Sequence, residues 1–314
     1  MELEASRGKP HPWVVVLISL LAVFLGFQLI GLFAGILLIS PFYEGTLVEM
    51  MEALARPTND PDMKLYLYCI QGCGAIIGFI VVPYFILQWI GQSYSTLLRS
   101  KFHIQPLVLV TFIAVAFMGV NSIFIEWNEK LRLPEFLSGV EDWARAMEDR
   151  LKEMTDFLTR FDSFPQFLIA FVVIAILPGI GEEIVFRGII QRELIRGTNN
   201  IHLSIWLAAA IFSGFHFQFY GFVPRMLLGA LFGYLYYWSG SLWLAMLAHF
   251  VNNGLMVLAM YFYQQGLIDI DIESTEAVSW SGVLFSAVIT SILLYLFKTF
   301  YDKQPSASSG EQAA

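Results

Sequence analysis

The chain has 314 residues, of which 57% are hydrophobic and only 14% are charged, and its mean hydropathy is +0.65. Soluble domains usually carry about 25% charged residues, so this composition excludes an ordinary soluble protein and indicates a polytopic membrane protein. The formal net charge of -8 argues against a nucleic-acid partner.

Long apolar runs predict about eight membrane-spanning helices. They cover residues 13–40, 66–91, 106–125, 165–196, 201–219, 223–238, 241–263 and 278–301. The first run exceeds the apolar core of a signal peptide, so we expect it to stay as an uncleaved span. The sixth is short, because a span usually needs about 20 residues. The expected fold class is all-α, a polytopic transmembrane helical bundle.

Residues 126–164 differ from the spans, because charged residues separate the apolar ones. Apolar side chains recur at steps of three and four, at Phe136, Val140, Trp143, Met147, Leu151, Met154 and Leu158. This pattern predicts one amphipathic surface helix that is too charged to span. It either covers the outer mouth of the bundle or simply connects two spans at the surface, and we favour the connection.

The distribution of Lys and Arg predicts the orientation in the membrane. The short segments 1–12, 92–105 and 191–200 and the C-terminal end carry most of these residues outside 126–164. Positively charged short loops favour the cytoplasmic side, so we expect both termini in the cytoplasm and the chain in the cell membrane. The polar C-terminal run QPSASSGEQAA is expected to be disordered.

Ionisable residues stand in three of the predicted spans. Glu182, Glu183 and Arg187 lie in LPGIGEEIVFRGII, His216 ends AAAIFSGFH, and His249 lies in WLAMLAHFVNNGLMV. Charged side chains are costly in hydrocarbon and are retained mainly where they face a polar cavity. Three apolar segments that supply Glu, His and His therefore predict one buried polar site.

The depth of these residues supports a common site. At about 1.5 Å per residue, Glu182 and His216 lie about 21 and 22 Å from the inner ends of their helices. His249 and Asn253 share one helical face, about 12 to 18 Å from theirs. All four depths overlap within a hydrocarbon core about 30 Å thick. Single amides in other spans are expected to form hydrogen bonds between helices: Gln71, Asn121 and Asn252.

Two adjacent glutamates in the fourth span receive different predictions. Glu183 and Arg187 are four residues apart, which is the spacing of a helical ion pair, so each buried charge gains a partner. Glu182 is then the spare carboxylate and a candidate general base. The preceding run PGIG is expected to break or kink the helix and admit water. The alternative is that all three charges form a packing network.

These motifs resemble a known family. EEIVFRG is similar to the EExxxR motif of the CPBP family of intramembrane endopeptidases, which includes type II CAAX prenyl endopeptidases and bacteriocin-processing, Abi-type proteins. Phe212 to His216 resembles its FxxxH motif, and His249 to Asn253 resembles its HxxxN motif. The likeness covers about residues 165–260, and three motifs in order are more specific than any one of them.

The resemblance implies an intramembrane endopeptidase that cleaves a peptide bond near or within the membrane. It implies that Glu182 is the catalytic carboxylate and that His216 helps it to activate water. His249 and Asn253 would bind or polarise the scissile carbonyl, with Glu183 and Arg187 in support. The chain then divides into N-terminal spans and the amphipathic connecting helix (1–164), a catalytic core (165–263), and the last span with a disordered tail (264–314).

The resemblance leaves the role of a metal open. Glu182, His216 and His249 would be an acceptable zinc set, because two His and one Glu hold zinc in known hydrolases. We favour no cofactor, because Asn253 is a poor zinc ligand but a good amide donor to an oxyanion.

Two other classes of function fit the same residues. One is a non-proteolytic membrane immunity or adaptor protein that binds a partner through the acidic outer segments. The other is a proton-coupled transporter, although such carriers often show repeated halves and the sequence shows no repeat. We expect the partners to be the lipid bilayer and a peptide or protein substrate, reached from the membrane or from the cytoplasmic side.

Overall fold

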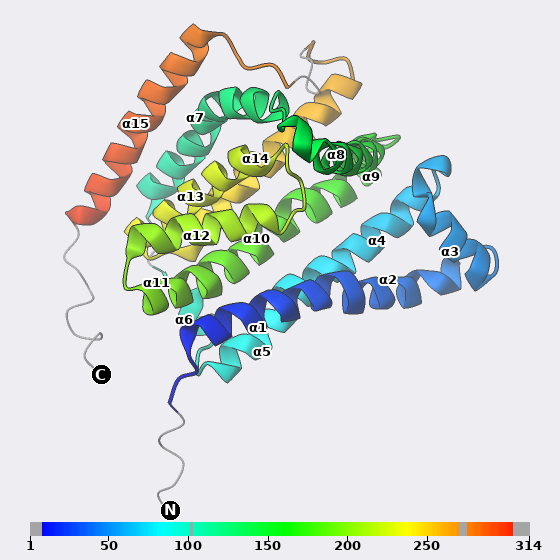
Figure 1. Ribbon diagram of the computed structural model, residues 1–314, viewed down its shortest axis with the longest axis horizontal. Coiled ribbons are helices and arrows are strands. Elements are labelled where there is room, and N and C mark those ends of the chain that lie inside the picture. The colour runs from blue at the N-terminus through cyan, green and yellow to red at the C-terminus, as the bar shows by residue number, and fades with distance from the viewer. Residues whose placement is uncertain (1–7, 101–102, 270–274, 304–314) are drawn as a thin grey trace, which may run out of the picture.

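A computed structural model describes residues 8–100, 103–269 and 275–303 of the chain (Figure 1). The predicted disordered tail lies outside these residues. Every regular element in the described part is a helix, and the helices pack as a polytopic bundle. The predicted all-α fold class is therefore confirmed.

Several helices follow one another without a break. A wide π-helical turn at Gly26–Gly31 joins α1 (Pro12–Leu25) to α2 (Leu32–Ile39). Another, at Ile77–Val81, joins α4 (Met63–Ile76) to α5 (Val82–Trp89). Two more join α9 (Phe164–Ala170) to α10 (Leu177–Glu183) through Phe171–Ile176, and α10 to α11 (Arg192–Thr198) through Ile184–Gln191. The remaining helices are α3 (Leu47–Ala55), α6 (Tyr94–Leu97), α7 (Ile104–Glu129), α8 (Ser138–Thr159), α12 (Ile201–Gly214), α13 (Phe222–Ser239), α14 (Leu242–Gln264) and α15 (Trp280–Asp302). Short 3-10 turns occupy Ser40–Phe42, Pro57–Asn59 and Glu135–Leu137.

Within the described residues, 6 helices are long and apolar enough to cross a membrane, rather than the eight expected. They are Pro12–Phe42, Met63–Trp89, Ile104–Glu129, Phe164–Thr198, Leu242–Gln264 and Trp280–Asp302. The predicted spans 201–219 and 223–238 become α12, with 14 residues, and α13, with 18. The helix α12 ends at Gly214, and Phe217 just beyond it adopts a left-handed backbone with φ 56. An apolar composition alone therefore overestimates the length of this helix.

The helices α12 and α13 form an antiparallel hairpin whose connecting loop, residues 215–221, contacts other parts of the bundle (Figure 1). Asn128, at the end of α7, donates from Nδ2 to the Phe219 carbonyl at 3.2 Å and accepts from the Val223 N–H at 2.8 Å. The Arg145 guanidinium of α8 lies 4.2 Å from the centre of the Tyr220 ring. This loop is therefore fixed by both α7 and α8.

The amphipathic helix α8 is attached at both ends. Near its start, Glu141 accepts hydrogen bonds from Arg132 at 3.0 Å and from the Leu133 N–H at 2.7 Å. These donors, Arg132 first, lower the pKa of Glu141 to about 2. Just beyond its end, the buried ammonium of Lys64 donates to the Arg160 carbonyl at 2.6 Å and pairs with Asp162 at 2.8 Å. The attachments hold α8 in a fixed place against the bundle.

Glycines allow the first two long helices to approach closely. A Cβ atom at Gly31 would lie 2.4 Å from the Gly74 Cα atom, and one at Gly78 would lie 2.7 Å from the Phe27 Cβ atom. Both distances are too short for a real Cβ atom, so only glycine fits at Gly31 and Gly78 without a shift of the neighbouring helix. Small residues are the usual means by which membrane helices pack closely. Both of these long helices contribute residues to the cavity described next.

Candidate functional site

The candidate site opens into a cavity of about 1050 Å³. Its lining includes Glu182, His216 and His249, together with residues of the first two long helices, α7 and α14. The helix α8 also lines it, through Trp143, Met147, Leu151 and other residues. Besides connecting two spans, α8 therefore contributes side chains to the cavity.

The glutamates lie where α10 passes into a π-helical segment, Ile184–Gln191. Such wide turns inside α-helices are frequently found at functional sites. The PGIG run does not break the helix as expected. A Cβ atom at Gly179 would lie 3.1 Å from the backbone nitrogen of Phe250, and one at Gly181 would lie 2.5 Å from the Phe79 Cβ atom. These glycines bring neighbouring helices close to Glu182.

Glu183 and Arg187 form the ion pair that their spacing predicts. Arg187 Nη1 donates to Glu183 Oε1 at 2.7 Å, and the side chains are 1% and 0% exposed. The second guanidinium nitrogen donates to the Gly229 carbonyl at 2.6 Å. The rings of Phe212 and Phe232 lie 4.9 and 5.4 Å from the guanidinium carbon. Arg187 thus ties the glutamates of α10 to the α12–α13 hairpin.

His249 is oriented by Glu183. Its Nδ1 atom lies 2.8 Å from Glu183 Oε1, which is a carboxylate oxygen that accepts, so Nδ1 carries the proton. The imidazole stacks on the Phe232 ring at 5.1 Å and is almost fully buried. Its Nε2 atom therefore faces Glu182 Oε2, at 3.9 Å.

His216 follows α12 in the loop, rather than lying on a helix as expected. Its Nδ1 atom donates to the Phe212 carbonyl at 2.9 Å, so its Nε2 atom is also free to accept. That Nε2 atom lies 3.9 Å from Glu182 Oε2. The side chain is 30% exposed, against 5% for His249, because it borders the cavity.

Three hydrogen-bond acceptors therefore meet at Glu182. Its Oε2 atom is buried and has no hydrogen-bond partner among the described residues. The separations of 3.9 Å are too long for direct hydrogen bonds. A water molecule between Glu182 Oε2 and either imidazole Nε2 atom could form a hydrogen bond of about 2.8 Å to each of them, with an angle near 90° at the water oxygen. The arrangement is suited to a water molecule that donates to the carboxylate and to one imidazole.

The same three atoms do not fit a zinc ion as they stand. Zinc lies about 2.0–2.2 Å from N and O ligands, so two ligand atoms of a tetrahedral site lie roughly 3.4 Å apart. The separations from Glu182 to the two imidazoles are 3.9 Å. No group of three His, Cys, Asp or Glu residues in the described part of the chain is placed to hold a metal ion.

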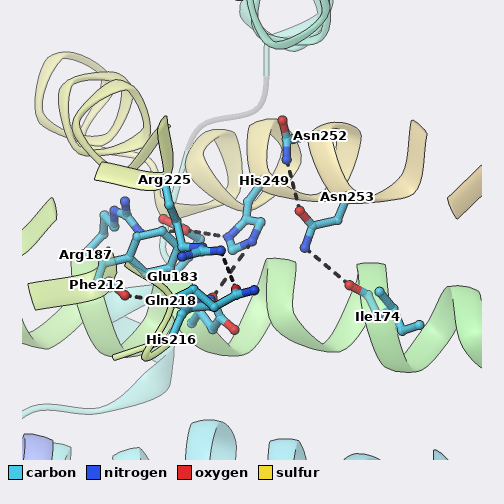
Figure 2. A network of polar contacts seen from close by, with 11 residues as sticks. Ile174, Glu183, Arg187, Phe212, His216, Gln218, Arg225, His249, Asn252 and Asn253 are labelled. Atoms are coloured by element: carbon cyan, nitrogen blue, oxygen red, sulfur yellow. Dashed lines mark hydrogen bonds and ion pairs between the residues drawn. The ribbon is translucent and has the colours of Figure 1, made fainter. Parts of the chain in front are cut away.

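Asn253 lines the cavity but does not point at Glu182. Its Nδ2 atom donates to the Ile174 carbonyl at 3.3 Å, and its Oδ1 atom accepts from Asn252 at 3.1 Å. Figure 2 shows Asn253 turned toward Ile174, apart from the imidazoles. The expected hydrogen bonds between helices are wrong for Asn252, which bonds within α14. They are also wrong for Asn121, whose Oδ1 atom has no partner among the described residues.

The structure adds three residues that the sequence analysis did not single out. Arg225 of α13 donates from Nη2 to Gln218 Oε1 at 2.6 Å (Figure 2). Gln218 Nε2 in turn donates to Glu148 Oε1 of α8 at 3.1 Å. All but Gln218 line the cavity. The sequence did contain a signal for Arg225. A charged residue in the apolar run FVPRMLLGALFGYLYY is as unusual as Glu182 is in the apolar run around it.

Comparisons with known proteins match the part of the chain that carries the candidate site. A family model described as "Type II CAAX prenyl endopeptidase Rce1-like" matches residues 164–255. An uncharacterized protein of Bacillus subtilis (strain 168), YpbD, is 27% identical over 95 residues, which are 29% of this chain and 46% of that protein. The chain thus matches less than half the length of this curated relative. No solved structure matches the chain. The resemblance is confirmed: residues 164–255, which carry Glu182, His216, His249 and Asn253, match the Rce1-like type II CAAX prenyl endopeptidase family.

Proposed function

We propose that this protein is an intramembrane endopeptidase in which Glu182 and two imidazoles activate water. One observation carries the proposal: Glu182 Oε2, which has no partner among the described residues, lies 3.9 Å from the Nε2 atoms of both His216 and His249, and all three residues line a large cavity. A buried carboxylate without a partner is costly, and hydrolytic sites are where such a group is useful. The match to an endopeptidase family supports the same conclusion.

The hydrolysis proceeds in two steps. Glu182 accepts a proton from the water molecule as the water oxygen bonds to the scissile carbonyl carbon, and the carbonyl electrons move to its oxygen. His216 accepts the second hydrogen bond of the water and orients it. The oxyanion then collapses to a carbonyl, the C–N bond breaks, and Glu182 returns its proton to the leaving nitrogen.

His249 and Asn253 bind the carbonyl oxygen in this mechanism. In this step His249 acts as an imidazolium: its Nε2 atom donates to the carbonyl oxygen, while its Nδ1 atom donates to the Glu183 carboxylate, which holds the ring in place. Arg187 holds the Glu183 carboxylate in place. The amide of Asn253 would leave the Ile174 carbonyl, to which its bond is long at 3.3 Å, to donate to the oxygen.

The substrate is a peptide or protein segment that enters the cavity from the membrane or from the cytoplasmic side. The catalytic core is residues 165–263, and both termini face the cytoplasm of the cell that carries the protein in its membrane. The helix α8 then lies on the outer face of the bundle, opposite the segments 92–105 and 191–200 that carry Arg and Lys.

The test is cleavage by the purified chain in lipid nanodiscs. A peptide library is incubated with the protein, and mass spectrometry identifies new termini. His216→Ala and His249→Ala should each lower the rate by roughly 100-fold or more. His202→Ala is the matched control, because His202 bonds to Tyr234 outside the cavity and its loss should leave the rate unchanged.

Three outcomes of this test would change the account. If the wild-type chain cleaves no peptide, the protease proposal is wrong. It is also wrong if His216→Ala, His249→Ala and the control His202→Ala all cleave peptides at the same rate. If the wild type carries one zinc per chain, and both active-site variants lose zinc with activity, Glu182, His216 and His249 are metal ligands and the metal-free step is wrong.

A further inference from the structure

Arg225 is the least explained charge at the site. Its Nη2 atom donates to Gln218, but its enclosed Nη1 atom has no hydrogen-bond partner among the described residues. The positive charge acts on Glu182 and His216 as well as on Glu148, yet the guanidinium forms an ion pair with none of them. A guanidinium N–H that is enclosed without an acceptor is costly to the folded chain. The cavity that Arg225 borders is where an acceptor can arrive.

The position of the guanidinium is fixed from two sides. Gln218 holds Nη2 at 2.6 Å and is itself held by Glu148 of α8. Gly221 leaves the space that the guanidinium occupies, since a Cβ atom there would lie 2.9 Å from Nη2 and 3.3 Å from Nη1. A charge held in this way is preorganised, and preorganised donors stabilise charge that develops during a reaction.

Asn253 is less well placed for that task. Its amide is turned toward Ile174, whereas Arg225 and Gln218 lie in the cluster with His216 and His249 (Figure 2). Hydrolysis of a peptide bond places a negative charge on the carbonyl oxygen, next to a carboxylate that has just taken a proton. A full positive charge stabilises that oxygen more than a neutral amide does.

We propose that Arg225 is a further catalytic residue, whose Nη1 atom binds the oxyanion of the tetrahedral intermediate. This inference rests on the proposed peptidase function and adds a donor to it. The group that Arg225 recognises is the oxyanion of a tetrahedral intermediate. The carbonyl oxygen of the bound peptide is neutral, and it becomes charged only when water adds to the carbonyl carbon. Arg225 therefore contributes little to substrate binding and much to the reaction step.

The test compares kinetics and inhibitor binding of Arg225→Gln with those of the wild type. The kcat should fall by about 100-fold while KM stays within about 3-fold. A phosphinic analogue of a cleaved peptide, which mimics the anion, should bind about 100-fold more weakly to the variant. A neutral ketomethylene analogue should bind both proteins equally. Lys152→Gln is the matched control, because it removes one positive charge from the α8 side of the same cavity.

Two further variants keep the proposal testable if Arg225→Gln folds poorly. Gly221→Ala retains the charge but displaces the guanidinium, so its kcat should also fall with KM unchanged. The activity of Arg225→Ala should recover in part on addition of guanidinium ions, and not on addition of ammonium ions.

Several results would overturn the role of Arg225. An unchanged kcat in Arg225→Gln would overturn it. Equal weakening of the binding of the anionic and the neutral analogue would also overturn it, because it would indicate a structural role for Arg225. A loss confined to KM, and only for peptides with a free C-terminal carboxylate rather than an amide, would make Arg225 a substrate anchor. A wild-type chain that cleaves no peptide would overturn the peptidase function itself, and Arg225 with it.

Discussion

Two neighbouring glutamates show how one residue step changes the chemistry of a buried carboxylate. Glu183 accepts from Arg187 and from His249 and is 0% exposed, so its charge is compensated inside the protein. Glu182 points to another face of the helix and has an oxygen without a partner among the described residues. Under the proposed function, Glu183 stabilises the site and Glu182 reacts. The i, i+4 spacing predicted this division, because it is a local property of a helix.

The division makes a prediction for stability. Arg187→Ala should lower the free energy of unfolding by about 3–5 kcal/mol, because it leaves Glu183 as a buried charge without its guanidinium. Glu182→Ala should cost much less or even stabilise, because it removes a carboxylate that is already without a partner. Chemical unfolding of both variants in the same detergent measures the difference.

Arg192→Ala is the control for this prediction. Arg192 lies on the same continuous helix, but its hydrogen bond is to the neutral side chain of Gln92 at a partly buried position. Arg192→Ala should cost less than Arg187→Ala. Equal unfolding free energies for Arg187→Ala and Glu182→Ala would contradict the compensated role of Glu183.

At the scale of elements, α8 shows what a pattern leaves undetermined. The spacing of its apolar side chains predicts an amphipathic helix, and the helix is present at Ser138–Thr159. The same apolar face can pack against lipid, against a neighbouring helix or along a cavity, so the pattern does not determine where the helix lies. The position depends on particular contacts, such as Lys64 with Asp162 and Glu148 with Gln218, which join residues far apart in the sequence.

The contact at Glu148 makes the attachment of α8 depend on pH. Burial raises the pKa of Glu148 above its ordinary value, and the nearby charge of Arg225 offsets this only in part. The folded chain therefore binds more protons than the unfolded chain between the ordinary and the raised pKa. Stability falls as pH rises through that window and stays lower above it.

Glu148→Gln should remove this loss, because glutamine stays neutral and can still accept from Gln218. The melting temperature of the variant should match that of the wild type near pH 4 and exceed it at pH 7. Melting curves of both proteins across this range in nanodiscs measure the effect. A difference that does not change with pH, or one that favours the wild type at pH 7, would contradict the burial of Glu148.

For the whole molecule, hydropathy predicts the membrane bundle but not every crossing. The six long helices lie within a few residues of the predicted spans. The predicted crossings at 201–219 and 223–238 form the α12–α13 hairpin. The helix α12 is shorter than predicted, because Gly214 and the left-handed Phe217 end it early, whereas α13 covers its predicted range. Turn conformation of this kind is not visible to an average over apolar residues.

The site was found from residue type and overlapping depth, which brought Glu182, His216 and His249 to one place. Its finer features could not be predicted in the same way. The turn of Asn253 toward Ile174 and the approach of Arg225 to Gln218 depend on π-helical turns and on loop 215–221. These set side-chain directions that a regular 3.6-residue helix does not give.

The most direct test of the account is the rate of peptide cleavage by Glu182→Gln in nanodiscs, measured beside the wild type. The glutamine side chain keeps the shape of the glutamate but cannot take a proton from water, so kcat should fall by at least about 1000-fold while the protein stays folded. Glu193→Gln is the matched control, because Glu193 lies on the same continuous helix and pairs with Arg196. It should cleave at the wild-type rate. Cleavage by Glu182→Gln at a rate near that of the wild type would contradict the role of Glu182 as the base.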